Sequence, residues 1–449
     1  MSKVEVNEID KQSGSTLTLG GSGTAVTLAC GATQTGFGRT GTVDWQTTKK
    51  TTAFTAANGE GYFVDTAASG AVTMTLPSSP SAGNIVAVKD YNGNFATANL
   101  TIARNGSPIN GANSADVIVN TNGASLVLVY VDATQGWVAT QDDSSTFAGE
   151  SFISATGGTI TTCGVDKIHT FTGPGTFTVS SIASCAANNL VSYMVVAGGG
   201  GSAGDRGGAG GAGGFRETKS PATPYTASPL CGHSTPGNRI TVTATGFPIA
   251  VGAGGAAKNS PPFTIGASGG VSTFSTISSA GGGGGGRSST GANGGSGGAS
   301  GSTGSGCTSK AGGSGNTPST TPPQGNDAGT SHDNPSYAQG GGGGATAVGG
   351  NATAGVGGPG GAGATTSING SATAFAGGGG GGADPASKGT GGAGGGGNGA
   401  SGPYPGSSIA AENGTCNTGG GGGGSNGGGG SVNGGNGGSG IVIIRYKSS

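Results

Sequence analysis

The chain has 449 residues, of which 108 are Gly, and charged residues make up only 8%, for a formal net charge of −1. This near-neutral charge excludes a strong electrostatic attraction to nucleic acid or to an anionic membrane surface. With 32% hydrophobic residues, the chain cannot build a large apolar core in each subunit, so a polar, β-rich, extended or assembled structure is expected.

Residues 1–51 are predicted to form a segment of short strands. Met1–Asp10 is polar and lacks the apolar stretch of a secretory signal, so no signal peptide is expected. The sequence has no run of 18 apolar residues, so no membrane span is expected either. Apolar and polar residues then alternate in Thr16–Leu19, Thr24–Leu28 and Thr42–Gln46, with Gly turns between them. The small apolar surface of these strands favours winding or stacking on copies of the same chain.

Residues 52–143 are predicted to form one β domain, a sandwich or a small barrel. Turn signals such as Tyr91–Asn94 and Thr121–Gly123 divide it into short strands of high β-propensity. The expected strands are Gly61–Thr66, Ala71–Leu76, Ile85–Tyr91, Asn99–Ala103, Asp116–Asn120, Ser125–Asp132 and Trp137–Thr140.

A polar link, residues 144–157, leads to a second group of strands in residues 158–197. These strands are expected at Thr159–Thr162, Lys167–Thr172, Gly175–Ser180 and Leu190–Ala197. The chain ends, in residues 441–449, with another strongly β-forming stretch, and a strand over Gly440–Tyr446 is predicted to pair with Leu190–Ala197. This pairing would close the base of the long insert, residues 198–440.

The insert is dominated by glycine, which makes up about one residue in three here, against roughly 7% in ordinary chains. Such a composition alone is also typical of disorder or of a silk-like protein. The order of the residues favours a folded structure, because the glycines form unbroken runs at Gly281–Gly286, Gly340–Gly344, Gly377–Gly382 and Gly419–Gly424.

Uninterrupted glycine runs suit the extended threefold helix called polyglycine II, which has about 3.1 Å rise per residue. Each N–H and C=O then points outward to a neighbouring strand, and a strand enclosed by neighbours has no room for a Cβ. A strand on the outside tolerates one side chain per turn, and Gly207–Gly214, which contains two alanines, is predicted to take that outer position. The linking segments would collect as loops at the two ends of the resulting bundle.

Catalytic and metal-binding patterns are not found in this sequence. The six cysteines are widely spaced, so free thiols are expected, with Cys163–Cys185 or Cys231–Cys307 as possible disulfides. The histidines His169, His233 and His332 lack ligand partners at suitable spacing, and His169 is expected to be structural. A glycan hydrolase needs two carboxylates across the scissile bond, which the sequence does not indicate. We therefore expect no enzymatic activity, no metal and no cofactor.

An ordered series of motifs does resemble a known family. It runs through Val195–Gly201, Gly213–Glu217, Ile249–Gly255, Ser272–Ile277 and Gly438–Tyr446. This series is similar to the glycine-rich C-terminal domain of tailed-phage tail fibres, including those of marine phages, and to the polyglycine-bundle adhesins at the fibre tips of some myophages. The resemblance covers residues 165–447, and Phe54–Trp137 resembles fibre shaft and neck modules. One departure is that the tip adhesins are separate subunits, whereas here the glycine-rich part is fused to β modules.

The resemblance implies a fibrous, trimeric phage protein with all-β N-terminal modules and a C-terminal polyglycine II helix bundle. Residues 1–51 would be the virion-proximal shaft, contacting other tail or virion proteins. The protein would be assembled in the host cytoplasm, reside in the phage tail, and attach the particle to a bacterial surface receptor, either a polysaccharide or an outer-membrane protein. The alternatives are a virion fibre or decoration protein that binds surfaces nonspecifically and a polysaccharide depolymerase.

Receptor contacts are expected from polar and aromatic side chains in the loops, because loops vary without disturbing the scaffold. The candidates, each of which is also compatible with an ordinary solvated loop position, are Lys310, His332, Asp333, Tyr337, Asp384, Lys388, Tyr404 and Glu412.

Overall fold

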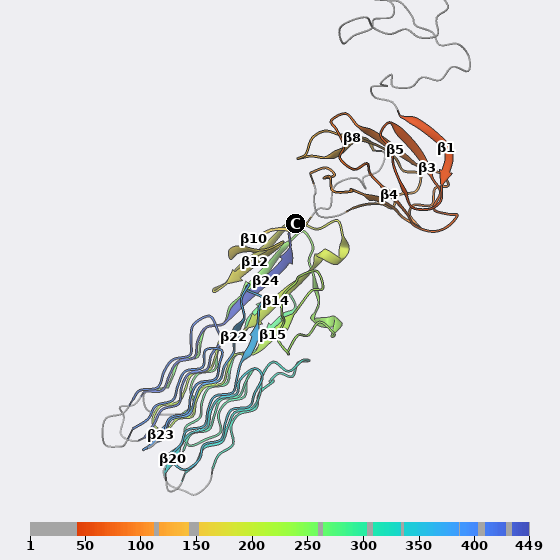
Figure 1. Ribbon diagram of the computed structural model, residues 1–449. Helices are drawn as coiled ribbons and strands as arrows, with labels where there is room; N and C mark the ends of the chain where they lie inside the picture. The colour runs from red at the N-terminus through yellow and green to blue at the C-terminus, as the bar shows by residue number, and fades with distance from the viewer. Residues whose placement is uncertain are drawn as a thin grey trace, which may run out of the picture. The chain divides into compact units, whose positions relative to one another are not determined.

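The chain divides into two compact units, Met1–Gly149 and Glu150–Ser449 (Figure 1). The computed structural model describes residues 43–111, 116–142, 152–258, 264–302, 309–333, 336–385, 387–402, 409–427 and 433–448. The strands predicted at Thr16–Leu19 and Thr24–Leu28 lie outside these residues. The described residues form strands and short 3-10 helices, η2 (Ala186–Asn189) and η3 (Pro236–Asn238), and no α-helix.

The first unit is a sandwich of two sheets. One sheet has the order β1 (Asp44–Lys50), β3 (Glu60–Val64), β5 (Ile85–Asp90), β8 (Ser125–Tyr130) and β9 (Trp137–Asp142). The other has the order β2 (Phe54–Thr55), β4 (Val72–Thr75), β6 (Leu100–Ala103) and β7 (Val117–Val119). All seven strands predicted between residues 52 and 143 are therefore present, and they lie in two separate sheets.

The backbone of this unit winds as a coil through its first six strands. The chain alternates between the two sheets from β1 to β6, and β1, β3 and β5 pair in parallel, as do β2, β4 and β6. Strands β8 and β9 then close the first sheet with antiparallel pairs. Each turn of the coil thus adds one strand to each sheet.

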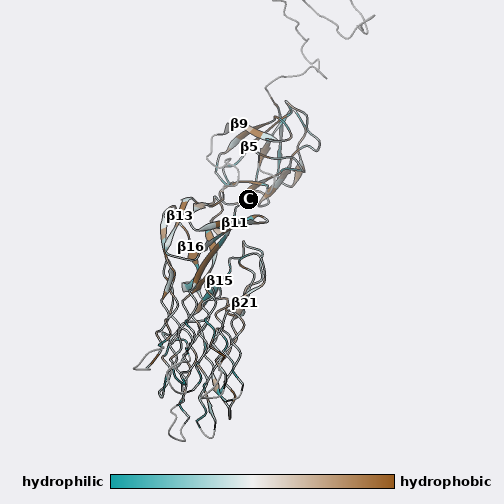
Figure 2. Ribbon diagram, turned by 90° about the vertical axis from the view of Figure 1, so that its left-hand side faces the viewer, coloured by the Kyte–Doolittle hydropathy of each residue, from teal (hydrophilic) through white to brown (hydrophobic). Residues whose placement is uncertain are grey.

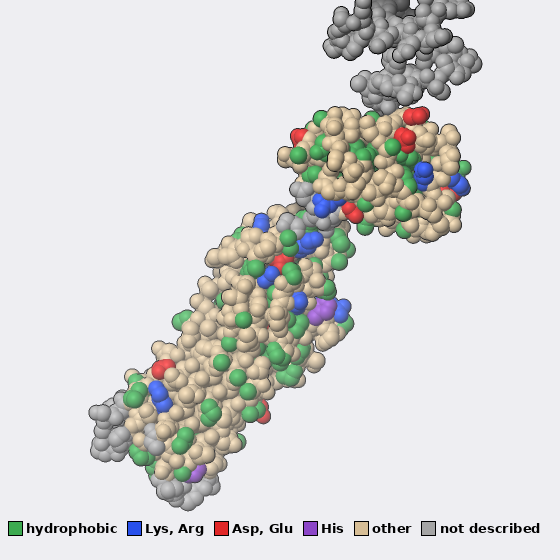
Figure 3. Space-filling model, viewed as in Figure 1, with side chains coloured by type: hydrophobic (Ala, Val, Ile, Leu, Met, Phe, Trp, Pro, Cys, Tyr) green, Lys and Arg blue, Asp and Glu red, His purple; other side chains and the backbone are tan. Residues whose placement is uncertain are grey.

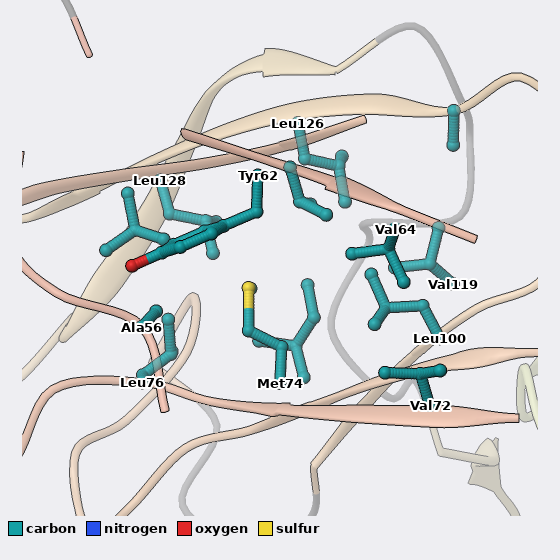
Figure 4. Close-up of a cluster of buried hydrophobic side chains, with 14 of the residues drawn as sticks. Ala56, Tyr62, Val64, Val72, Met74, Leu76, Leu100, Val119, Leu126 and Leu128 are labelled. Carbon is teal, nitrogen blue, oxygen red and sulfur yellow. The ribbon is translucent and has the colours of Figure 1, made fainter. Parts of the chain in front are cut away.

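The core of the first unit lies between these sheets (Figure 4). Tyr62 and Leu128 from one sheet face Met74 and Val72 from the other, and all four are buried. Alternation explains this arrangement, because Thr73 and Thr75, the neighbours of Met74, are only half-buried on the opposite face. In residues 43–142, two sheets from one chain therefore enclose an apolar core.

The second unit begins with another two-sheet sandwich. Its first sheet has the order β10 (Ser154–Thr156), β13 (Gly175–Ser181), β17 (Gly246–Ala250), β18 (Ser272–Phe274) and β19 (Ile277–Ser279). Its second has the order β11 (Thr159–Cys163), β12 (Asp166–Phe171), β24 (Ile441–Lys447), β14 (Leu190–Val196) and β15 (Phe215–Thr218), with β16 (Ile240–Thr241) also paired to β14.

The last strand, β24, lies in the middle of this second sheet, as Figure 1 shows. It pairs antiparallel with β14 on one side and β12 on the other, so the predicted pairing of the C-terminal strand is confirmed. Val196 and Ile441 face each other in this register. The two ends of the glycine-rich insert therefore leave the sheet side by side.

Both faces of the second sheet are covered by apolar side chains. Tyr193 and Val195 of β14 pack toward the first sheet, while Met194 and Val196 pack on the opposite face. That opposite face is covered in part by the hairpin of β21 (Ala364–Thr366) and β22 (Thr373–Phe375). In Figure 2 the apolar residues accordingly gather in the strands near β11, β15 and β16, whereas the glycine-rich segments are pale.

The glycine-rich segments run side by side away from the sandwich (Figure 1) and bond to one another through their backbones. Successive amides of the Gly377–Gly382 run donate to different neighbours. The donor and acceptor pairs are Gly377 to Gly394, Gly378 to Gly361, Gly379 to Gly210, Gly380 to Gly397 and Gly381 to Gly358. The chain thus returns to the same neighbour at every third residue, with one neighbour parallel and another antiparallel.

This packing leaves no space for side chains inside the glycine runs. A Cβ on Gly379 would lie within 3.0 Å of the carbonyl oxygen of Gly422. A Cβ on Gly421 would lie equally close to the carbonyl oxygen of Gly210. Real Cβ atoms essentially never approach backbone so closely. The runs are therefore uninterrupted because backbone of another segment occupies the place of each side chain.

The outer position predicted for Gly207–Gly214 is wrong. Ala209 and Ala212 are fully buried, and this segment bonds to segments on several sides, for example from Gly210 to Gly422 and from Gly211 to Gly283. The methyl group of Ala209 lies 3.2 Å from the place that a Cβ on Gly379 would take. A methyl therefore fits in the interior where the facing residue is glycine.

Candidate functional site

The loops between glycine-rich segments gather at the end of the second unit that lies away from the sandwich, called the distal end here. Short strands β20 (Tyr337–Ala338) and β23 (Ala383–Asp384) mark it in Figure 1. Backbone bridges join different loops near this end, among them Ala203 with Lys258 and Ser401 with Ile409. The glycine-rich segments thus hold these loops on a common backbone frame.

Tyr337 and Asp384 are brought together at this end. They are directly paired in the β20–β23 ladder, and both are half-buried. The guanidinium of Arg206 lies over the Tyr337 ring, 4.1 Å from its centre. An arginine stacked in this way holds a fixed direction for its N–H donors. The sequence analysis did not select Arg206, although Asp205-Arg206 is a charged interruption between glycines.

His332 and Lys310 lie near the same end. His332 exchanges backbone hydrogen bonds with Ala338 of β20, at 2.8 and 3.0 Å, and its Nδ1 lies 3.2 Å from the carbonyl oxygen of Ser336. The Lys310 carbonyl accepts a 2.6 Å hydrogen bond from Ser300, and its side chain is half-buried. Asp333 differs from the expectation, because it is buried and does not offer its carboxylate to the surface.

Lys388 and Glu412 form an ion pair at the side of this end. Lys388 Nζ lies 3.7 Å from Glu412 Oε1, and Asn398 donates a 2.9 Å hydrogen bond to Glu412 Oε2. This hydrogen bond and the nearby Lys388 hold the pKa of the Glu412 carboxyl below its usual value. Because the Glu412 side chain is about half exposed, the pair remains accessible to a partner. Tyr404 lies outside the described residues.

The visible surface of the glycine-rich part carries few charges (Figure 3). Asp205 and Arg287 form a second ion pair, with Arg287 also donating to the Asp205 backbone carbonyl at 2.9 Å. Ile265, Val356 and Ile409 are exposed aliphatic side chains whose backbone bridges place them among the same loops. The distal end therefore offers aromatic, aliphatic and hydrogen-bonding groups with little net charge.

His169 and the cysteines of the second unit show no arrangement for catalysis or metal binding among the described residues. His169 is buried between Gly157, whose carbonyl lies 2.7 Å from Nδ1, and the Tyr446 hydroxyl, which lies 3.0 Å from Nε2. Burial lowers the pKa of His169, which favours the neutral form of the ring. Cys163, Cys185, Cys231 and Cys416 are free thiols. Cys307, the partner considered for Cys231, lies outside the described residues.

The sequence of the second unit matches a known family. A family model described as a glycine-rich domain matches residues 170–447. The chain belongs to the glycine-rich domain family. The matched residues include β14 and β24 of the second sheet and the glycine-rich segments between them, whereas β11 lies before the match. No curated protein matches the chain significantly.

Within the described part of the chain, no group of three His, Cys, Asp or Glu side chains is arranged to hold a metal ion. Asp205 pairs with Arg287, and Glu412 pairs with Lys388. In the same described part, no helix has both the length and the apolar character that a membrane span needs.

Proposed function

We propose that this protein is a non-enzymatic phage tail fibre that attaches the virion to a bacterial surface through the distal loops of its glycine-rich domain. The observation that carries the proposal is the gathering of Tyr337, Asp384 and His332 at the end of a backbone-bonded scaffold. A scaffold whose hydrogen bonds run through the backbone tolerates changes in loop side chains, as a receptor-binding protein requires. The motif resemblance supports the same assignment.

We further infer that the glycine-rich segments form a polyglycine II bundle. In the Gly377–Gly382 run, hydrogen bonds to the same neighbouring segment recur at every third residue. This spacing supports a polyglycine II helix, because that helix has three residues per turn. The mixture of parallel and antiparallel neighbours is compatible with it, because each strand bonds in all directions around its axis. Hydrogen exchange monitored by mass spectrometry tests the inference. Glycine amides in 377–382 should exchange as slowly as those of β14, and rapid exchange would contradict the bundle.

Binding of the full-length protein to bacterial cells tests the proposed function. The fluorescently labelled protein is incubated with a panel of bacterial species, and bound fluorescence is measured by flow cytometry. We expect saturable binding to a minority of strains, reduced severalfold by Tyr337→Ala, because truncating an aromatic anchor at an interface typically costs more than about 1 kcal/mol. Tyr91→Ala, which removes an exposed tyrosine from the first unit, is the matched control.

The pattern of binding separates this proposal from its alternatives. Equal binding to all strains, unaffected by Tyr337→Ala, would favour a fibre or decoration protein with nonspecific surface affinity. If the protein binds to none of the strains, the receptor-binding assignment is refuted. Release of oligosaccharides from the cells during incubation would instead indicate a depolymerase.

A further inference from the structure

Strand β11 is an exposed edge of the second sheet in the second unit. It pairs with β12 on one side, and the described sheet has no strand on its other side. The first four of its five residues are exposed, and the last, Cys163, is half-buried. The backbone N–H and C=O groups on the outer side of an edge strand can pair with another strand. β11 lies in the sandwich, away from the distal loops (Figure 2).

The sequence of β11, Thr-Ile-Thr-Thr-Cys, lacks the features that normally protect an edge strand. Such features are charged side chains, proline, bulges and very short length. The other edge strands of the four larger described sheets do have them. Strands β1, β9 and β15 carry charged residues, and β2, β7, β10 and β19 have at most three residues each. The register of β11 on β12 is also regular, so β11 is the edge best suited to accept a further strand.

A second copy of β11 matches this edge in the antiparallel direction. In a pair centred on Thr161, this residue faces Thr161 of the second copy, and Ile160 faces Thr162. Thr159 then faces Cys163. This register brings no charges together, and β-branched residues that face each other across two strands stabilise a sheet. A strand that matches itself in this way meets the requirement of a twofold contact, in which both copies use the same surface.

We propose that two copies of this protein associate by antiparallel pairing of their β11 strands. The two second sheets then form one continuous sheet. β11 belongs to the same sheet as β14 and β24, which lead into the glycine-rich segments, so antiparallel pairing points the two sets of distal loops in opposite directions. A twofold contact cannot build a trimer, so this contact is additional to the trimer that the resemblance implies. It is also independent of the proposed receptor binding.

Sedimentation velocity of the full-length protein in reducing buffer tests this contact. Few residues meet in it, so concentrations up to about 100 μM are needed. We expect the unmodified protein to reach twice the mass that it has at low concentration. Thr161→Lys should weaken this association severalfold, because two lysines would then lie directly opposite each other. Thr178→Lys is the matched control, since Thr178 is also exposed but lies in β13, which is paired on both sides.

Mixing two charge variants tests the twofold register. Thr161→Glu alone should also weaken the association, whereas an equimolar mixture of Thr161→Lys and Thr161→Glu should restore it, because opposite charges then face each other. The proposal is overturned if the unmodified protein does not associate at any concentration, or if Thr161→Lys leaves its association unchanged. Two weakened variants that the mixture does not restore would also overturn it, and would indicate that β11 pairs with a different strand, of this chain or of another protein.

Discussion

At the scale of single residues, the glycine runs are the positions where a small change has the largest expected effect. Gly379→Val and Gly421→Val each place a branched side chain where the backbone of another segment lies. We expect each substitution to lower the free energy of unfolding by about 1–3 kcal/mol, the typical effect of overpacking a core. Gly173→Val is the control, because no atom lies within 4 Å of its Cβ position.

Chemical denaturation of the full-length variants measures these differences. The buried position of Ala209 predicts that Ala209→Val is also destabilising, unlike a change on an outer strand. Equal stability of the Gly379, Gly421 and Gly173 variants would show that the runs are not packed in solution as they are here.

His169 gives the second unit a predictable response to pH. The Gly157 carbonyl can only accept, so Nδ1 carries the proton and Nε2 accepts from the Tyr446 hydroxyl in the neutral ring. Burial lowers the pKa of His169, with a smaller effect in the same direction from Lys167. The unfolded chain therefore binds the proton more readily, and the stabilising contribution of the neutral ring is lost as the pH falls below about 6.5.

We expect the free energy of unfolding of the second unit to decrease between about pH 7.5 and pH 5, and this decrease should be smaller in His169→Gln. Urea denaturation followed by tyrosine fluorescence at several pH values measures it, with NMR titration of His169 as an independent measurement. A pKa of His169 at or above its usual value would contradict the argument.

At the scale of elements, a buried ion pair joins the last strand, β24, to its neighbour in the sheet, β12. Arg445 of β24 donates from Nε to Asp166 of β12 at 2.7 Å, and both side chains are at most 3% exposed. Arg445 also donates to the carbonyls of Ser367 and Ile368, at 3.4 Å each, in the loop between β21 and β22. The pair therefore links the central sheet to the hairpin that covers it.

Arg445→Met should lower the free energy of unfolding by about 3–5 kcal/mol, because it leaves the Asp166 carboxylate buried without its partner. Arg287→Met is the matched control. It breaks the Arg287–Asp205 pair, in which the arginine side chain is about one-third exposed, so the expected loss is at most about 1 kcal/mol. Thermal and chemical denaturation of both variants measures the difference, and equal losses would show that burial does not control the strength of these pairs.

At the scale of the whole molecule, we predict a parallel homotrimer along residues 13–143, with closed cyclic symmetry. The first unit has its own core and does not need partners for that purpose, so the prediction rests on the resemblance to phage fibres. Strand β1 is at the edge of its sheet and exposes Trp45, which offers a surface for a neighbouring copy. Mass photometry of the full-length protein should give three times the monomer mass of 41.5 kDa, and a stable monomer would contradict it.

Local sequence patterns predict the strands of the first unit and the pairing of strands that closes the second unit. Strands of the first unit were predictable because alternating apolar residues and turn signals are local properties, as Val72–Thr75 and the Tyr91–Asn94 turn illustrate. The pairing of β24 with β14 was predictable because only these two long apolar stretches bracket the insert. The uninterrupted runs likewise indicated an interior without side chains.

The identity of the neighbouring segments could not be predicted from the sequence and is seen in the folded structure. The parallel coil of β1 to β6 and the interior position of Gly207–Gly214 depend on pairings between distant residues, and nearly identical glycine segments carry no local signal that distinguishes one neighbour from another. The candidate site depends on the same choice. Arg206 lies over Tyr337, and Ser302 lies beside Arg206, because the backbone register of three separate segments brings them together. That register is set by packing throughout the domain.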